Sequence, residues 1–173
     1  MSRRYWLGLA KDWGVSIGVV VAAFVLWGLF ATPRPISDGP APEFALSSLQ
    51  GESVKLSDFG EDEVVVLNFW FTTCGPCRHE IPELTKYHEA HPEVPLLGIS
   101  VDALPLRQLA GRSEKLGITY TVLHDERSQV AAAYGVRIFP TTIVVRGGEV
   151  ISSRIGEVDE RSLGAMVAAA RAR

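Results

Sequence analysis

Cys74 and Cys77 are the two cysteines of this 173-residue chain, and Gly75 and Pro76 separate them. Two intervening residues let the sulfur atoms meet across one helical turn, so the pair can form and break a disulfide. A cysteine at a helix N-terminus tends to be a thiolate, because the helix dipole and the unpaired amides favour negative charge. The thiolate is the attacking species in thiol–disulfide exchange. The spacing therefore predicts a redox site.

Other uses of the cysteine pair are less well supported. A structural disulfide that closes so small a loop would constrain the unfolded chain little and stabilise the fold weakly. A metal site lacks ligands, since no further cysteine and no spaced histidine pair completes a set of four. Arg78 follows Cys77 where a c-type haem attachment motif has histidine. We therefore expect no metal and no cofactor.

The runs around the pair alternate between strand-like and helix-like patterns. Residues 64–69 (VVVLNF) are almost continuously apolar, as in a strand that is covered on both faces. The further elements that we expect are a helix over 76–90 that Pro82 kinks, a strand over 95–101, a helix over 106–116, a short strand over 120–123, a short helix over 129–134, a hairpin of 141–145 and 149–155, and a helix over 159–170. This order predicts an α/β sandwich with a mixed sheet.

The N-terminal part carries an uncharged apolar run over residues 13–30 (WGVSIGVVVAAFVLWGLF). A helix of this length rises about 27 Å, which is close to the hydrocarbon thickness of a bilayer. A buried core helix is disfavoured, because the run lacks a polar face. A cleaved signal peptide is the stronger alternative, but a bulky residue stands three positions before a cleavage after Ala31. We predict an uncleaved transmembrane anchor over 13–31.

Flanking charges predict the orientation of this anchor. Three basic residues precede it, whereas Arg34 alone follows it closely, so residues 1–12 are expected in the cytoplasm and the remainder outside it. Residues 32–42 hold four prolines and predict a stiff tether. A domain over 43–173 would follow. A net charge of −3 without a basic run predicts no nucleic-acid partner. Exported cysteines tend to be oxidised, so the pair must act as an oxidant or receive electrons from a dedicated donor.

Several further motifs accompany the cysteines. They are Pro42–Leu46, Val54–Phe59, Asn68–Trp70, Glu80, Pro82, Tyr134–Val136 and Pro140–Thr142. With them, residues 40–173 resemble the thioredoxin superfamily, and specifically its membrane-anchored TlpA/ResA-type branch of redoxin/AhpC-TSA-like domains. The resemblance implies a thioredoxin-like fold with an N-terminal hairpin and an insertion over 106–123. A peroxidase is excluded, because no proline stands just before Cys74.

The resemblance implies roles for the residues of the site. Cys74 would form a mixed disulfide with the partner, and Cys77 would resolve it. Pro140 would be a cis-proline lying against the disulfide, and the backbone of Phe139 would pair with an extended substrate segment. An ordinary turn proline is the alternative. Thr73 departs from the family, which usually has tryptophan there, so the partner preference is left open.

Glu80 follows Cys77 by three residues and shares its helical face. In TlpA/ResA-type proteins a glutamate here lies near the active site and tunes the proton affinities of the cysteines, so Glu80 would accept or relay the proton of Cys77. The alternative is a solvated helix carboxylate. Asn68 stands where cytoplasmic thioredoxins have a buried aspartate, which favours a role for Glu80.

Together these patterns predict a thiol–disulfide oxidoreductase on the extracytoplasmic face of a bacterial inner membrane, working as a reductase. The Gly-Pro dipeptide between the cysteines is the one found in reducing thioredoxins. The resemblance implies a membrane-embedded thiol reductant as electron donor. It also implies client proteins that bear disulfides, such as apocytochromes c or copper-site assembly factors. The alternatives are a disulfide-forming oxidant or isomerase, a copper metallochaperone and a tethered interaction module.

Overall fold

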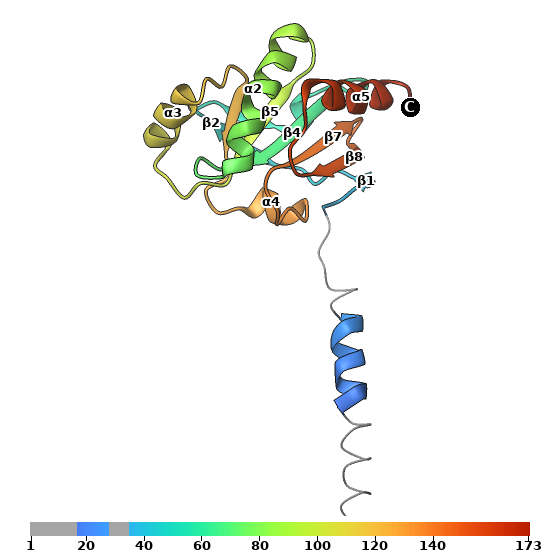
Figure 1. The fold of residues 1–173 in the computed structure, drawn as a ribbon. Coiled ribbons are helices and arrows are strands. Elements are labelled where there is room, and N and C mark those ends of the chain that lie inside the picture. The colour runs from blue at the N-terminus through green and yellow to red at the C-terminus, as the bar shows by residue number, and fades with distance from the viewer. Residues whose placement is uncertain (1–16, 28–34) are drawn as a thin grey trace, which may run out of the picture. The chain divides into compact units, whose positions relative to one another are not determined.

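The computed structural model describes residues 17–27 and 35–173. The chain divides into two units, Met1–Pro33 and Arg34–Arg173. Residues 17–27 are helical (Figure 1). The predicted cytoplasmic segment and both ends of the predicted anchor lie outside the described residues. Among those that are described, no helix has the length and apolar character needed to cross a membrane.

The second unit is built on one sheet of eight strands. The sheet is mixed, as the sequence predicted. The strands are β1 (Gly39–Pro40), β2 (Ala45–Ser48), β3 (Ser53–Lys55), β4 (Val64–Trp70), β5 (Leu96–Ser100), β6 (Thr121–His124), β7 (Thr141–Arg146) and β8 (Glu149–Ile155). Their order is β1-β8-β7-β4-β5-β6-β2-β3. β4 is parallel to β5 and β5 to β6, whereas the remaining pairs are antiparallel.

Helices cover both faces of this sheet (Figure 1). They are α2 (Gly75–Ala90), α3 (Leu106–Lys115), α4 (Gln129–Ala133) and α5 (Glu160–Arg171), with a short 3₁₀ turn at Leu56–Asp58. Side chains alternate along β4, so Leu67 and Phe69 join the cluster on the α4 side. Val66 and Trp70 join the clusters formed with α2, α3 and α5. The same alternation turns the polar Asn68 toward α2.

The predicted tether is the main point at which the structure differs from the sequence prediction. Gly39 and Pro40 pair with β8 as an edge strand, and Ala41 is buried. The amide of Ile36 also donates to the carbonyl of Tyr134 at 3.1 Å. Prolines are compatible with this position, because an edge strand does not require every amide to donate. The folded unit therefore begins before residue 43, and the expectation that 32–42 is a stiff tether and not a folded element is wrong for its second half.

One edge of the sheet gathers the ends of several central elements. β4, β5 and β6 are mutually parallel, so their carboxyl ends meet there. β7 runs antiparallel to β4 and begins at the same edge, where Thr141 lies opposite Phe69. The predicted insertion is present as α3 and β6. This edge receives the cysteine loop, the segment after β5 and the loop that holds Pro140.

Candidate active site

Cys74 and Cys77 form a disulfide where β4 passes into α2. Their Cα atoms are 5.3 Å apart. Cys74 is the N-cap of α2, and its Sγ accepts a hydrogen bond from the amide of Cys77 at 3.1 Å. Cys74 is 6% exposed to solvent, whereas Cys77 is only 1% exposed. Cys74 is therefore the sulfur that a partner can reach first, and it lies where the helix dipole favours negative charge.

Polar side chains hold the loop that precedes Cys74, and we call them the polar bracket: Thr72, Ser100, Asp102, Arg112 and His124. The Asp102 carboxylate accepts hydrogen bonds from the amide and hydroxyl of Thr72, each at 2.8 Å, and from the Ser100 hydroxyl at 2.9 Å. Arg112 on α3 donates to the Thr72 hydroxyl at 3.2 Å. The ring of His124 lies 2.9 Å from the backbone carbonyl of Asp102. Five side chains thus fix the approach of the chain to the disulfide.

Sequence reasoning missed Asp102 as a residue of this site. The available signal was positional: Thr72 follows β4 and Asp102 follows β5, and these neighbouring parallel strands end at the same edge. A carboxylate directly after a buried strand can accept several backbone and hydroxyl hydrogen bonds from the adjacent loop. We interpret Asp102 as a positioning residue, since it acts on the cysteines through Thr72.

The loop before β7 provides an apolar rim beside the disulfide. The peptide bond between Phe139 and Pro140 is cis, as the resemblance implied. Phe71 and Phe139 meet edge to face at 5.5 Å, and both pack against the buried cluster that contains the cysteines. Ile138 is 55% exposed. We call Phe71, Ile138 and Phe139 the apolar rim.

The backbone of this loop is only partly used within the domain. The carbonyl of Pro140 accepts from Gly156, and the carbonyl of Ile138 accepts from the Thr141 hydroxyl at 2.7 Å. Among the described residues, we find no hydrogen bond to the amide or carbonyl of Phe139. An extended segment that reaches Cys74 could pair with these two groups.

Glu80, in the second turn of α2, is buried, and only 1% of the residue is exposed. Its carboxylate accepts hydrogen bonds from Asn68 of β4 at 2.9 Å and from the amide of Val158 at 3.0 Å. The hydroxyl of Thr142 of β7 lies 3.4 Å away. The alternative that Glu80 is a solvated helix carboxylate is therefore wrong.

Burial raises the pKa of Glu80 from its ordinary value of 4.5 to about 7. The hydrogen bonds from Asn68, Val158 and Thr142 oppose this effect, because they favour the charged form, whereas the nearby charge of Glu157 adds to it. The carboxyl group can therefore gain and lose a proton near neutral pH, which a general acid–base group requires.

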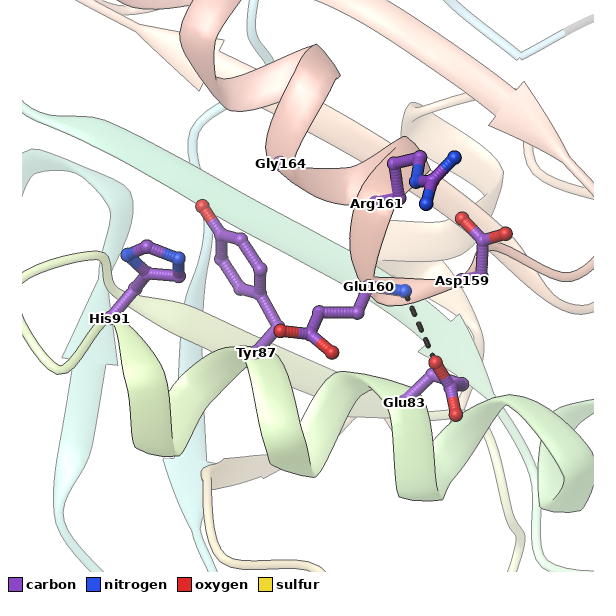
Figure 2. Close-up of a pocket in the computed structure, with 7 residues that line it drawn as sticks. All are labelled: Glu83, Tyr87, His91, Asp159, Glu160, Arg161 and Gly164. Carbon is purple, nitrogen blue, oxygen red and sulfur yellow. Dashed lines mark hydrogen bonds between the residues drawn. The ribbon is translucent and has the colours of Figure 1, made fainter.

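A separate hollow of about 590 Å³ lies between α2 and α5 (Figure 2). It is lined by Glu83, Tyr87, His91, Asp159, Glu160, Arg161 and Gly164. Glu83 of α2 accepts a hydrogen bond from the Glu160 amide of α5 at 3.4 Å, and Asp159 caps α5. It contains no cysteine and none of the predicted site residues. Within the described part of the chain, no group of three or more histidine, cysteine or acidic side chains is arranged to hold a metal ion.

Thiol–disulfide exchange requires one reachable sulfur, a second sulfur that can displace the partner, and a surface on which the partner chain can align. Cys74, Cys77 and the loop of the cis-proline meet these three needs on a thioredoxin-like sheet. The fold and the site thus define a thioredoxin-like thiol–disulfide oxidoreductase.

Comparison with known proteins gives the same class. The chain belongs to the AhpC/TSA family, whose model matches residues 38–154, and within it to the thiol–disulfide oxidoreductases of ResA type. The ResA oxidoreductase of Halalkalibacterium halodurans is 29% identical over 92% of this chain and 90% of its own. That of Bacillus thuringiensis is 30% identical over 79% and 80%.

Solved structures show the same fold. A putative thiol:disulfide interchange protein DsbE from Chlorobium tepidum superposes with a TM-score of 0.71 at 29% identity, covering 80% of this chain and 99% of the other. StoA from Bacillus subtilis gives a TM-score of 0.63 at 21% identity over 73% and 96%, which supports the fold alone.

Replacing Asp102 by asparagine should loosen the polar bracket. The amide offers one acceptor oxygen, so at least one of the buried donors of Thr72 and Ser100 loses its partner. We expect a loss of about 1–3 kcal/mol in the free energy of unfolding and slower thiol–disulfide exchange. Urea unfolding and a stopped-flow exchange assay measure these effects. Asp62→Asn is the matched control, because Asp62 is fully exposed in a surface ion pair. Equal stability of the two variants would contradict the stabilising role of Asp102 in the polar bracket.

The buried carboxyl of Glu80 should make stability depend on pH. Its pKa is higher in the folded than in the unfolded chain, so its contribution is complete below about pH 4.5 and declines as pH rises through about 7. From pH 4.5 to 8 the wild-type chain should lose about 2–4 kcal/mol relative to Glu80→Gln. Urea unfolding of both proteins across this range measures the difference. Parallel curves would show that Glu80 does not titrate in this range.

Proposed function

We propose that this chain is an extracytoplasmic, membrane-tethered thiol–disulfide oxidoreductase that reduces the disulfides of client proteins. The observation that carries the proposal is the Cys74–Cys77 disulfide at the N-terminus of α2, with Gly75 and Pro76 between the cysteines. The uncharged run over 13–31 and the basic residues before it support the tether.

The reduced pair acts in two exchange steps. The Cys74 thiolate attacks one sulfur of the client disulfide, forms a mixed disulfide and releases the first client thiol. Cys77 then loses its proton, attacks the Cys74 sulfur and releases the second client thiol. Two electrons and two protons pass to the client, and the Cys74–Cys77 disulfide forms again. The lower exposure of Cys77 suits the resolving role, because a buried thiol meets no competing partner.

Glu80 supplies the proton acceptor for the second step. A carboxyl with a pKa of about 7 takes the proton of Cys77 when it is ionised and returns it when the pair is reduced again. Asn68 lies against Glu80 and cannot titrate, so Glu80 is the group of this pair that carries the proton. Resolution should therefore become faster as pH rises through about 7.

The direction of electron flow depends on the reduction potential of the Cys74–Cys77 pair, which measures the relative stability of its dithiol and disulfide forms. The Gly-Pro dipeptide is the one found in reducing thioredoxins. Because the exported side of a membrane oxidises free cysteines, a reductase there needs a membrane-embedded thiol donor. Oxidised CxxCH motifs of apocytochromes c and the cysteines of copper-site assembly factors are the clients that we propose.

A disulfide-forming oxidant is the second candidate, and one observation favours it. The Cys77 amide donates to the Cys74 sulfur at the helix N-terminus, and an amide in this position stabilises a thiolate. A more stable thiolate makes the disulfide form the stronger oxidant.

The equilibrium reduction potential decides between these candidates. We expect the full chain, in an uncharged detergent and in glutathione or dithiothreitol buffers, to give a value near that of thioredoxin, about −270 mV. A value near about −120 mV, as in the oxidant DsbA, would reverse the proposed electron flow. The fraction of oxidised protein is read by alkylation of the free thiols.

Single cysteine variants test the two exchange steps. Cys77→Ser should accumulate a mixed disulfide between Cys74 and its client, because nothing resolves it, whereas Cys74→Ser should form none and should lose reductase activity. Non-reducing gels and mass spectrometry of membranes from expressing cells measure both results. Equal and mild effects of the two variants would contradict the assigned order.

A further inference from the structure

A basic cleft opens beside the disulfide on the side of α3. It consists of two adjoining hollows of about 380 and 420 Å³ that share Arg78, Lys115 and Leu116. Thr73 and Arg112 line the first hollow, and Gly75 lines the second. Both hollows therefore reach residues directly next to Cys74. We call this surface the α3 cleft.

Positive charge dominates the α3 cleft. Arg78, Arg112 and Lys115 are all exposed, and no carboxylate lines either hollow. None of the three forms an ion pair with another residue of the part that the structure describes. The hollow between α2 and α5 is different, because three carboxylates line it (Figure 2). The cations of the α3 cleft are thus concentrated at the redox site of a chain whose net charge is −3.

The small side chain of Thr73 keeps this cleft accessible from the disulfide. A bulky aromatic side chain at this position would occupy space next to the first cysteine. Here Thr73 is exposed and forms part of the wall of the first hollow. A chain segment bound at Cys74 can therefore continue into the cleft and meet its cations.

We propose that the α3 cleft binds an acidic segment of the client polypeptide, close in sequence to the cysteine that Cys74 attacks. This inference rests on the proposed function and names the class of client. The partner must present its disulfide at Cys74 while its carboxylates meet Arg78 and Lys115. A polypeptide with aspartate or glutamate within a few residues of its cysteine satisfies both needs at once. The apolar rim and the backbone of Phe139 contact other parts of the same segment.

The cleft acts on encounter and alignment, and not on the bond exchange itself. In each turnover the reduced pair passes two electrons and two protons to the client disulfide, whatever charges flank it. Complementary charge raises the rate of association, and salt weakens this effect. A charge change at Lys115 should therefore alter the rate with charged clients and leave the rate with a neutral client almost unchanged.

Three peptides with one internal disulfide each provide the test. They are identical except that aspartate, asparagine or lysine flanks the cysteines. The full chain is reduced with dithiothreitol, separated from it and mixed with each peptide. We expect the aspartate peptide to react about ten-fold faster than the lysine peptide at low salt. This ratio should approach one in roughly 1 M salt, where the screening length is short.

Variants then locate the effect. Lys115→Glu should lower the aspartate-to-lysine rate ratio at least three-fold, and Lys115→Gln should lower it by less. Arg161→Glu makes the same charge change on α5, outside the cleft, and should leave the ratio unchanged. The reduction potential of each variant should match that of the wild type, which separates recruitment from a change in the cysteines themselves.

The outcomes separate this inference from the proposed function. Exchange with all three peptides at equal rates would contradict the proposed binding of acidic segments by the α3 cleft, and it would leave the oxidoreductase function supported. No exchange even with the asparagine peptide would overturn the proposed function and the inference with it. Equal peptide rates together with Lys115-dependent binding to phosphatidylglycerol vesicles would contradict the binding of an acidic client segment. They would show that the α3 cleft binds a lipid surface.

Discussion

The buried carboxylate of Glu80 joins the parts of the domain that must keep a fixed arrangement. It belongs to α2, but its hydrogen-bond donors come from β4, from β7 and from the segment that leads into α5. A buried carboxyl without such partners would be strongly destabilising, so this position selects an arrangement in which all three donors converge. That arrangement holds the second turn of α2 against the carboxyl end of β4 and the start of β7. The disulfide and the cis-proline loop are consequently held at one edge of the sheet.

The surroundings of the disulfide combine two kinds of chemistry. The apolar rim consists of Phe71, which follows β4, and of Ile138 and Phe139 in the loop before β7. The α3 cleft, with Arg78 and Lys115, lies on the side of the insertion. An apolar surface aligns many segments, whereas charge discriminates among them. The insertion thus supplies Arg112 of the polar bracket and Lys115 of the α3 cleft, whereas Arg78 comes from α2.

Much of the fold could be predicted, because the central strands are continuous apolar runs and the later helices have clear apolar faces. β4 extends one residue beyond its prediction, and the hairpin of β7 and β8 matches closely. The second half of the predicted tether was wrong, since proline and glycine mark an edge strand and a free linker alike. Asp102 was missed because its importance depends on which strands are neighbours.

The sequence by itself determined the redox pair and the α/β class of fold, because each depends on local spacing or on runs of residues of one kind, and the resemblance to a known family implied the cis-proline. The tertiary structure decided the state of Glu80, since its pKa depends on burial and on donors 12, 62 and 78 residues away. It also brought Arg78 of α2 together with Arg112 and Lys115 of α3 beside Cys74. Charges that are scattered along the chain act jointly only where folding places them within a Debye length of one another.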